Sequence, residues 1–289
     1  MTATATTPAD RPRTGAPAAA PRRRRRGPLA WLREHVVSIV AAGAFLYLLL
    51  PNAVVVLFSF NRPEGRFNLT WQRFSLDAWL HPCGAPGLCE ALGLSLKIGL
   101  AATVLATALG TLAAFAMARH RFRGRSSANL LIFLPMATPE VVMGSSLLTL
   151  FVNLRFPLGA TTILLAHVMF CLSFVIVTVK ARIAGLDPRL EQAAMDLYAD
   201  EKQTFLRVTL PLVAPGIGAA ALLSFALSFD DYIITNFNAS ASSVTFPMYV
   251  YGAASRGTPV QINVIGTVMF VLALVAVGVG QLSARRRAR

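Results

Sequence analysis

The chain has 289 residues, of which 55% are hydrophobic and only 14% are charged. An ordinary soluble domain is less apolar and has about a quarter of its residues charged, so this composition excludes such a domain and favours a membrane protein. The net charge of +14 does not indicate a nucleic-acid-binding domain, because the Lys and Arg residues cluster at the ends of apolar runs.

The N-terminal stretch is rich in Thr, Ala, Pro and Arg and cannot bury enough apolar surface to fold. We predict that residues 1–35 form a disordered, basic cytoplasmic tail. Five arginines at 22–26 resemble the start of a signal peptide, but the apolar run that follows is longer than a signal peptide needs, so it is taken as a membrane span. The arginines are interpreted as a topology anchor, with contact to anionic lipid headgroups as the alternative.

Six apolar runs follow, and each is long enough to cross a bilayer as a helix of about 20 residues. They lie at residues 36–60, 92–118, 128–153, 160–182, 210–238 and 261–282, and polar residues interrupt the fifth. We therefore predict an all-α polytopic membrane protein with six transmembrane helices, whose membrane domain covers residues 36–284.

Basic residues divide unevenly between the two sets of loops that six spans create. One set holds the N-terminal tail, RHRFRGR at 119–125, the segment 180–207 and the C-terminal tail 285–289, whereas the other set holds only five Arg. Because basic loops favour the cytoplasm, both termini are predicted to be cytoplasmic. Lys97, a lone cation near a span end, is expected to snorkel to the interface.

Two of the three cysteines lie in the loop after the first span. Cys83 and Cys89 stand in HPCGAPGLCE, where Gly and Pro allow the chain to turn back. A loop-closing disulfide and two free thiols are both compatible with this spacing. Cys171 falls inside the fourth span and is expected to be a small core residue.

Three acidic residues fall inside predicted spans, where a carboxylate is costly unless it faces water or a partner. Glu140 follows Pro135 in LPMATPEVV, whose prolines must loosen or kink the helix. Asp230 and Asp231 lie in the outer part of the fifth span. Consecutive helical residues point about 100° apart, so one of the two is expected to face the substrate path and the other to pair with a neighbouring helix unless the helix is irregular. As a group, the three carboxylates are expected to line a substrate path, with structural hydrogen bonding or interfacial exposure as the alternative.

Catalytic and nucleotide-binding motifs are missing from the sequence. The four His are scattered, and neither HExxH nor GxSxG at a strand-to-helix turn occurs. There is also no GxxxxGK[ST] phosphate loop, so the chain is not expected to bind or split ATP by that mechanism, and we predict no bound cofactor or metal and no enzymatic activity.

The segment 187–211 departs from the pattern of plain membrane helices. Asp187 and Pro188 are a typical helix start, and Leu190, Ala193, Ala194 and Leu197 then recur at helical spacing as a narrow apolar stripe. Such a stripe permits a partner to approach closely. A helix that lies on the lipid headgroups is the alternative that periodicity alone allows.

This segment resembles the Glu-Ala-Ala loop of bacterial ABC importer permeases. The positions that keep the family pattern are Ala193, Ala194, Asp196, Leu197, Ala199, Leu210 and Pro211. The pattern is broken at Gln192, where the family has Glu, and at Tyr198, where it has a Gly that is free to take a positive φ. The resemblance implies that the segment 187–211 contains the coupling helix that inserts into a cleft on an ATPase subunit. The coupling residues that it implies are Gln192, Ala193, Ala194, Asp196, Leu197 and Tyr198.

Further matches extend the resemblance from about residue 45 to 284. They occur in RHRFRGR at 119–125, HVMFCLSFVIVTVKARIAGLD at 167–187, SFDDYIITNF at 228–237 and PVQINVIGT at 259–267. These segments are similar to the second permease subunit of spermidine/putrescine importers. Importers of ferric ion or aminophosphonates share much of the same pattern and remain alternatives.

The resemblance implies the type I ABC importer permease fold in a bacterial inner membrane. It also implies four kinds of partner: a second permease subunit, two copies of an ATPase subunit that uses ATP-Mg, an extracytoplasmic solute-binding protein and the lipid bilayer. Trp71 and Trp79 align with family tryptophans, and Trp79 is expected either to form an aromatic lip of the substrate path or to anchor the chain at the membrane interface. A secondary transporter without ATP is the rival from another class, and a scaffolding membrane protein is a third option.

Overall fold

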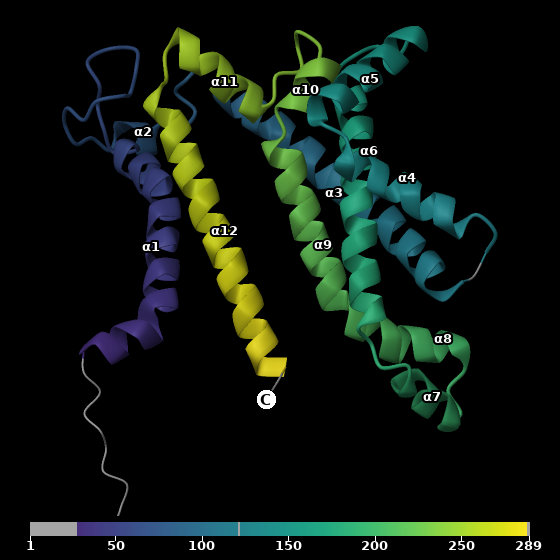
Figure 1. The fold of residues 1–289 in the computed structure, drawn as a ribbon. Helices are drawn as coiled ribbons and strands as arrows, with labels where there is room; N and C mark the ends of the chain where they lie inside the picture. Colours follow the sequence, from purple (N-terminus) through teal and green to yellow (C-terminus); the bar gives the residue numbers. More distant parts are fainter. Residues whose placement is uncertain (1–27, 121, 288–289) are drawn as a thin grey trace, which may run out of the picture. The chain divides into compact units, whose positions relative to one another are not determined.

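The computed structural model describes residues 28–120 and 122–287, and over these ranges the chain is helical apart from loops and one isolated pair of extended residues (Figure 1). The predicted all-α class is confirmed. The helices are α1 (Pro28–Phe58), α2 (Asp77–Leu80), α3 (Leu88–Arg119), α4 (Arg125–Ala137), α5 (Glu140–Asn153), α6 (Ala160–Ala184), α7 (Arg189–Asp196), α8 (Glu201–Thr204), the π-helix η1 (Phe205–Thr209), α9 (Leu210–Asp230), α10 (Ile233–Asn238), α11 (Phe246–Arg256) and α12 (Val260–Arg287).

The chain divides into two compact units between Pro51 and Asn52. The first unit contains the N-terminal part of α1, which begins at Pro28, inside the range 1–35 that was predicted to be disordered. Pro is favoured at the first position of a helix, since its missing N–H has no partner there in any case. Residues 1–27 of the predicted tail lie outside the described residues.

At the other end of the chain, α12 continues to Arg287 and so includes most of the predicted tail 285–289. Residues 288 and 289 lie outside the described residues. Helical structure therefore extends into the ranges of both predicted tails.

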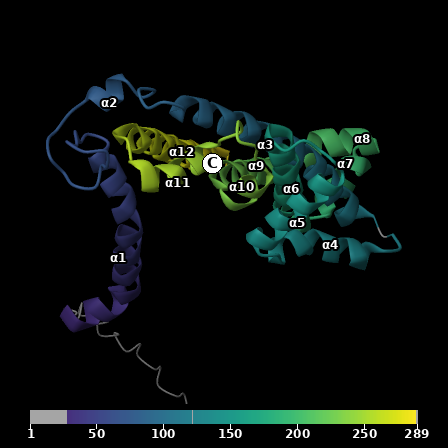
Figure 2. The ribbon, with the colours of Figure 1, turned by 90° about the horizontal axis from the view of Figure 1, so that it is seen from above.

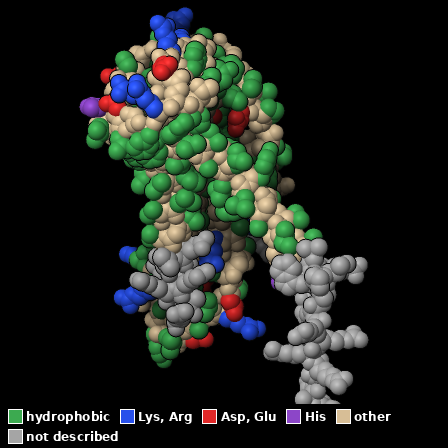
Figure 3. All heavy atoms as spheres, turned by 90° about the vertical axis from the view of Figure 1, so that its left-hand side faces the viewer, with side chains coloured by type: hydrophobic (Ala, Val, Ile, Leu, Met, Phe, Trp, Pro, Cys, Tyr) green, Lys and Arg blue, Asp and Glu red, His purple; other side chains and the backbone are tan. Residues whose placement is uncertain are grey.

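Five helices of the described residues are long and apolar enough to cross a membrane, and the number rises to six if the bent pair α4 and α5 is one span. The candidate spans are His35–Phe58, Leu88–Arg119, Ala160–Ala184, Glu201–Asp230 and Val260–Gly280, with mean hydropathies from 1.9 to 2.5. Large apolar side chains lie exposed along them, as is suited to contact with lipid. On the face shown in Figure 3, hydrophobic side chains fill the middle and Lys and Arg side chains lie toward the ends.

The core of the second unit is formed by α3, α6 and α9, which pack against one another (Figure 2). Small and β-branched side chains fill this core and allow close approach of the helices. One close point is Gly110 of α3, where a Cβ atom would lie 2.6 Å from Cγ1 of the fully buried Val175 in α6. Only glycine permits that approach.

The two regions predicted to be functional lie at opposite ends of these core helices. Helices α5, α10 and α11 gather at the end where α9 finishes, whereas α7 and α8 lie at the end where α6 finishes and α9 begins (Figure 1). Helices α6 and α9 therefore connect the intramembrane carboxylates to the segment 187–211.

Candidate functional site

Two interrupted helices meet near the predicted acidic residues. The break between α4 and α5 falls at Thr138 and Pro139, and the two helices differ in direction by 107°. Proline disfavours a helical backbone at the residue before it, and Thr138 is extended with ψ 130°. The predicted loosening of LPMATPEVV is therefore a full break, which places Glu140 in the first turn of α5.

The second break lies between α9 and α10, where Asp231 has an extended backbone with ψ 125°. Helix α10 then packs against α5 at Gly144, where a Cβ atom would lie 2.8 Å from the ring of Phe237 and 3.3 Å from Cα of Ile234. The side-chain amide of Asn238 donates to the carbonyl of Gly144 over 3.5 Å and to that of Ile234 over 2.8 Å. The two broken helices thus hold each other in place.

A cavity of about 460 Å³ opens beside the two breaks, and we call it the acidic cavity. Its lining residues are Glu140, Phe170, Ala226, Leu227, Asp230, Asp231, Tyr232 and Ile233. The structure therefore brings together the three carboxylates that the sequence analysis selected from two different spans. Glu140 and Asp230 are exposed, and neither side chain has a hydrogen bond or ion pair within the described part of the chain, whereas Asp231 is buried.

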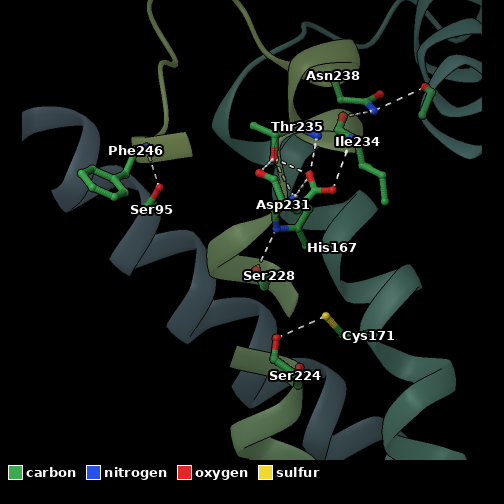
Figure 4. Close-up of polar contacts among 11 residues, drawn as sticks. Ser95, His167, Cys171, Ser224, Ser228, Asp231, Ile234, Thr235, Asn238 and Phe246 are labelled. Atoms are coloured by element: carbon green, nitrogen blue, oxygen red, sulfur yellow. Dashed lines mark hydrogen bonds and ion pairs between the residues drawn. The ribbon is translucent and has the colours of Figure 1, made fainter. Parts of the chain in front are cut away.

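Asp231 is held by partners on two helices (Figure 4). Its Oδ2 accepts hydrogen bonds from the backbone N–H of Thr235 over 2.7 Å and from the Thr235 hydroxyl over 2.8 Å, and its Oδ1 accepts from the N–H of Ile234 over 3.3 Å. These bonds satisfy the first free N–H groups of α10, as a capping side chain does. Nε2 of His167 in α6 lies 3.3 Å from Oδ2.

His167 is the residue of this site that sequence reasoning missed. Its ring is 2% exposed, with Nδ1 2.7 Å from the Ser228 hydroxyl and Nε2 2.9 Å from the Thr235 hydroxyl (Figure 4). The imidazole therefore links α6 to both sides of the break between α9 and α10. The available signal was its position inside an apolar run, because an ionisable side chain in a span needs a polar partner whatever its charge.

Trp79 lies outside the acidic cavity. Its indole N–H donates to the Ser59 hydroxyl over 3.3 Å, and its ring stacks on Phe60 with centroids 5.3 Å apart. It also packs against Ala78 and Val260. In this structure Trp79 is part of an aromatic cluster of the loop after α1, and it does not line the cavity that contains the carboxylates.

Cys83 and Cys89 form a disulfide, with Cα atoms 5.4 Å apart, and so close a short loop before α3. This settles the alternative that the sequence left open. Cys171 is a free, fully buried thiol in the core, as expected.

A second and larger cavity of about 840 Å³ lies between the first part of α3 and α11. Its charged lining residues are Glu90, Lys97 and Arg256. Lys97 is exposed in this cavity. The mixture of charges gives this cavity no clear preference for a cation or an anion.

The segment 187–211, here called the coupling loop, folds as two short helices and a π-helix. Asp187 accepts a hydrogen bond from the N–H of Arg189 over 2.9 Å at the start of α7, as the predicted helix start requires. Asp200 accepts one from the N–H of Gln203 over 2.6 Å and so caps α8. Local capping therefore defines both helices of the loop.

Most of the predicted coupling residues are exposed, namely Gln192, Ala193, Asp196, Leu197 and Tyr198, while Ala194 is half-buried. Leu197 and Tyr198 are 81% and 99% exposed, an unusual state for large apolar side chains. Tyr198 has φ +64°, the left-handed conformation that a Gly at this position adopts without strain. The loop thus keeps a glycine-like backbone at a non-glycine residue.

The chemistry available at the acidic cavity is the binding of positive charge. Among the described residues, no group of three His, Cys, Asp or Glu side chains is arranged to hold a metal ion. Glu140 and Asp230, which have no partner among the described residues, lie in the same lining as the rings of Phe170 and Tyr232. Carboxylates and aromatic rings both attract an organic cation.

Most of the chain matches a single protein family. Residues 106–288 match the family described as binding-protein-dependent transport system inner membrane component. The chain is also 36% identical to the spermidine/putrescine transport system permease protein PotC of Escherichia coli strain K12 over 245 residues, which cover 85% of this chain and 92% of the relative.

Two other relatives have the same identity. The PotC protein of Haemophilus influenzae is 36% identical over 256 residues, or 89% of this chain and 97% of the relative. The putrescine transport system permease protein PotI of Escherichia coli strain K12 is 36% identical over 242 residues, or 81% of this chain and 84% of the relative.

Solved structures share the fold at low sequence identity. A bacterial ABC transporter involved in the import of the acidic polysaccharide alginate matches with a TM-score of 0.65 and 14% identity, over 89% of this chain and 98% of that chain. An amino acid ABC transporter matches with a TM-score of 0.56 and 16% identity, over 74% of this chain and 100% of that chain. These matches concern the arrangement of helices alone.

Proposed function

The chain belongs to the family of binding-protein-dependent transport system inner membrane components, and we propose that its cargo is a polyamine such as spermidine or putrescine. As a family member it is a multi-pass inner-membrane permease of an ABC importer and has no catalytic role itself. The relatives at 36% identity carry the names of spermidine/putrescine and putrescine permeases, which supports a polyamine over other solutes.

The observation that carries the proposal is the pair of open carboxylates in the acidic cavity. A polyamine is a flexible polycation with little else to bind, so it requires carboxylates and aromatic faces. Glu140 and Asp230 supply two negative charges, and Phe170 and Tyr232 supply rings in the same lining. Ferric ion favours a compact set of ligands, and the described residues offer no such cluster.

We assign Asp230 and Glu140 to cargo contact and Asp231 to holding the cavity open. Within the described residues, the Asp231 carboxylate makes its hydrogen bonds to α10 and to His167, so its charge is directed into the protein. Trp79 has a role at the membrane interface in this proposal, because its ring is engaged with Phe60 away from the cavity.

The proposed assembly contains a second permease subunit, two ATPase subunits and an extracytoplasmic solute-binding protein. Both chain termini are cytoplasmic in this proposal, which the excess of Lys and Arg in one set of loops supports. The coupling loop then lies on the ATPase side, where its exposed Leu197 and Tyr198 contact the ATPase. ATP binding by the ATPase pair moves the coupling loops, and the permease pair switches between inward-facing and outward-facing states.

The test is uptake of labelled spermidine and putrescine into proteoliposomes that contain the full complex. The proposal predicts uptake that requires ATP and the solute-binding protein and that unlabelled polyamine abolishes. Uptake that survives an inactive ATPase but collapses with the ion gradient would instead show a secondary transporter. Competition by ferric ion or an aminophosphonate, and none by polyamines, would reject the proposed cargo and retain the importer.

A further inference from the structure

A polar tie joins the coupling loop to the core helices through three residues. Arg119 is the last residue of α3, Glu191 lies in α7 and Thr209 ends η1. Nη2 of Arg119 donates a hydrogen bond to Oε1 of Glu191 and forms an ion pair with it. The Thr209 hydroxyl donates to the same oxygen over 2.5 Å, and Nη2 of Arg119 also donates to the Thr209 hydroxyl over 3.4 Å. Each of the three side chains is therefore hydrogen-bonded to the other two.

The tie is partly shielded from water. Thr209 is fully buried, and the side chains of Glu191 and Arg119 are 25% and 39% exposed. A shielded pair with an additional hydrogen bond resists separation better than an ion pair on an open surface. Removal of the Glu191 charge would leave the guanidinium without its partner at this position.

An aromatic contact supports the same connection. Phe205 at the start of η1 packs edge to face on Phe115 of α3, with ring centroids 5.1 Å apart. The π-helical turn from Phe205 to Thr209 lies between this contact and the tie, and π-helical turns occur frequently at functional sites. The coupling loop is thus fixed to the end of α3 and to the start of α9 by both polar and apolar contacts.

Glu191 and Gln192 face different surroundings although they are neighbours. Glu191 points to Arg119 and Thr209, whereas Gln192 is exposed. The Glu-Ala-Ala pattern draws attention to position 192, but the residue that contacts the core helices is at position 191. The exposed position faces a docked partner, and the inward position faces the permease.

We propose that Glu191 is a positioning residue that transmits movement of the coupling loop to α3 and α9. This inference rests on the proposed function. Helix α9 runs from Leu210, directly after Thr209 of the tie, to Asp230 in the acidic cavity. A displacement of α7 by the ATPase therefore acts through Glu191 on the same helix that presents a cargo carboxylate.

The experiment compares Glu191→Gln with a matched control, Glu201→Gln, in the reconstituted complex. Glu201 is an exposed acid in the same loop, and its side chain makes no hydrogen bond or ion pair within the described residues. Three quantities are measured for each variant: the amount of ATPase that copurifies, the basal ATP hydrolysis, and the stimulation of hydrolysis by the solute-binding protein with spermidine.

Glu191→Gln is expected to retain copurification and basal hydrolysis and to lose stimulation about tenfold, as the coupling energies of contacting residues suggest. Glu201→Gln is expected to match the wild type. The exchange Arg119→Glu with Glu191→Arg places opposite charges at the two positions again and is expected to restore most of the stimulation.

Three results would overturn the inference. They are full stimulation in Glu191→Gln, a parallel loss of copurification and stimulation, and no recovery in the exchanged pair. Absence of stimulation in the wild type is a separate outcome, because it would reject the proposed polyamine cargo and not the role of Glu191.

Discussion

Oδ2 of Asp231 lies 2.7 Å from the backbone nitrogen of Thr235, so this acid caps α10 from the end of α9. Its neighbour Asp230 lines the same cavity but has no partner in the described part of the chain. Two consecutive carboxylates are therefore expected to respond differently to substitution, because one maintains the helix break and the other faces the cavity.

Asp230→Asn is expected to impair transport and to leave the fold intact. The substitution removes a charge that can attract a cation but breaks no hydrogen bond of the described structure. We expect KM for spermidine uptake to rise about tenfold, the effect of losing one partly solvated ion pair. Uptake kinetics in proteoliposomes measure this, and an unchanged KM would remove Asp230 from the cargo site.

Asp231→Ala is expected to destabilise the protein by about 2–4 kcal/mol, because it removes the cap of α10 and leaves buried partners unsatisfied. Denaturant unfolding in detergent micelles measures the free energy of unfolding. Asp230→Ala is the matched control and should unfold like the wild type. Equal losses in the two variants would contradict the different roles assigned to the two acids.

Gly144→Ala is expected to separate α5 from α10. The added methyl group would lie 2.8 Å from the ring of Phe237 and 3.3 Å from Cα of Ile234, so the helices must shift, at a cost of about 1–3 kcal/mol. Gly278→Ala in α12 meets no atom within 4 Å and serves as control. The midpoint temperature of thermal unfolding and the rate of spermidine uptake should both fall in Gly144→Ala and stay unchanged in Gly278→Ala. Normal uptake in Gly144→Ala would show that the packing of α5 on α10 is dispensable.

Tyr198→Gly is expected to strengthen coupling, since glycine adopts φ +64° without the strain of about 1 kcal/mol that tyrosine bears. Combined with Gln192→Glu, it restores the two positions that depart from the Glu-Ala-Ala pattern. Stimulated ATP hydrolysis should rise, by up to about fivefold for each kcal/mol gained. Tyr198→Ala removes the ring but retains most of the strain, so it should show little gain. Unchanged stimulation in the double variant would mean that the departures are neutral in this chain.

Much of the fold is predictable from the sequence because the membrane leaves few choices. The apolar runs locate the helices, and Pro135 and Pro139 indicate that the third run is interrupted. The direction of the second half, 107° from the first, was not predictable, because it depends on α5 packing against α10 at Gly144. That contact joins residues far apart in the chain.

The acidic cavity was predictable in part. A carboxylate inside a span is costly unless it faces water or a partner, and this rule selects Glu140, Asp230 and Asp231. The helical spacing indicates that the side chains of the two aspartates point in different directions. The end of α9 at Asp231 was not predictable, because a cap inside an apolar run depends on His167 and Thr235, and His167 lies 64 residues away. For Trp79 the sequence left two roles open, and its contacts with Ser59 and Phe60 could not be predicted because they depend on the fold of the loop after α1.

In the coupling loop, the residue that contacts the core helices is next to the position that the Glu-Ala-Ala pattern specifies. The pattern emphasises position 192, whereas the structure places Glu191 against Arg119 and Thr209. Helical periodicity predicts that positions 191 and 192 face different directions, but not that the end of α3 supplies the partner of the first.

The most direct test of the importer account is ATP hydrolysis by the complete complex in liposomes, with the solute-binding protein and spermidine added separately and together. The account predicts basal hydrolysis with either one alone, and increased hydrolysis with accumulation of spermidine when both are present. Hydrolysis that stays at the basal rate under all of these conditions, with no accumulation of spermidine, would contradict it.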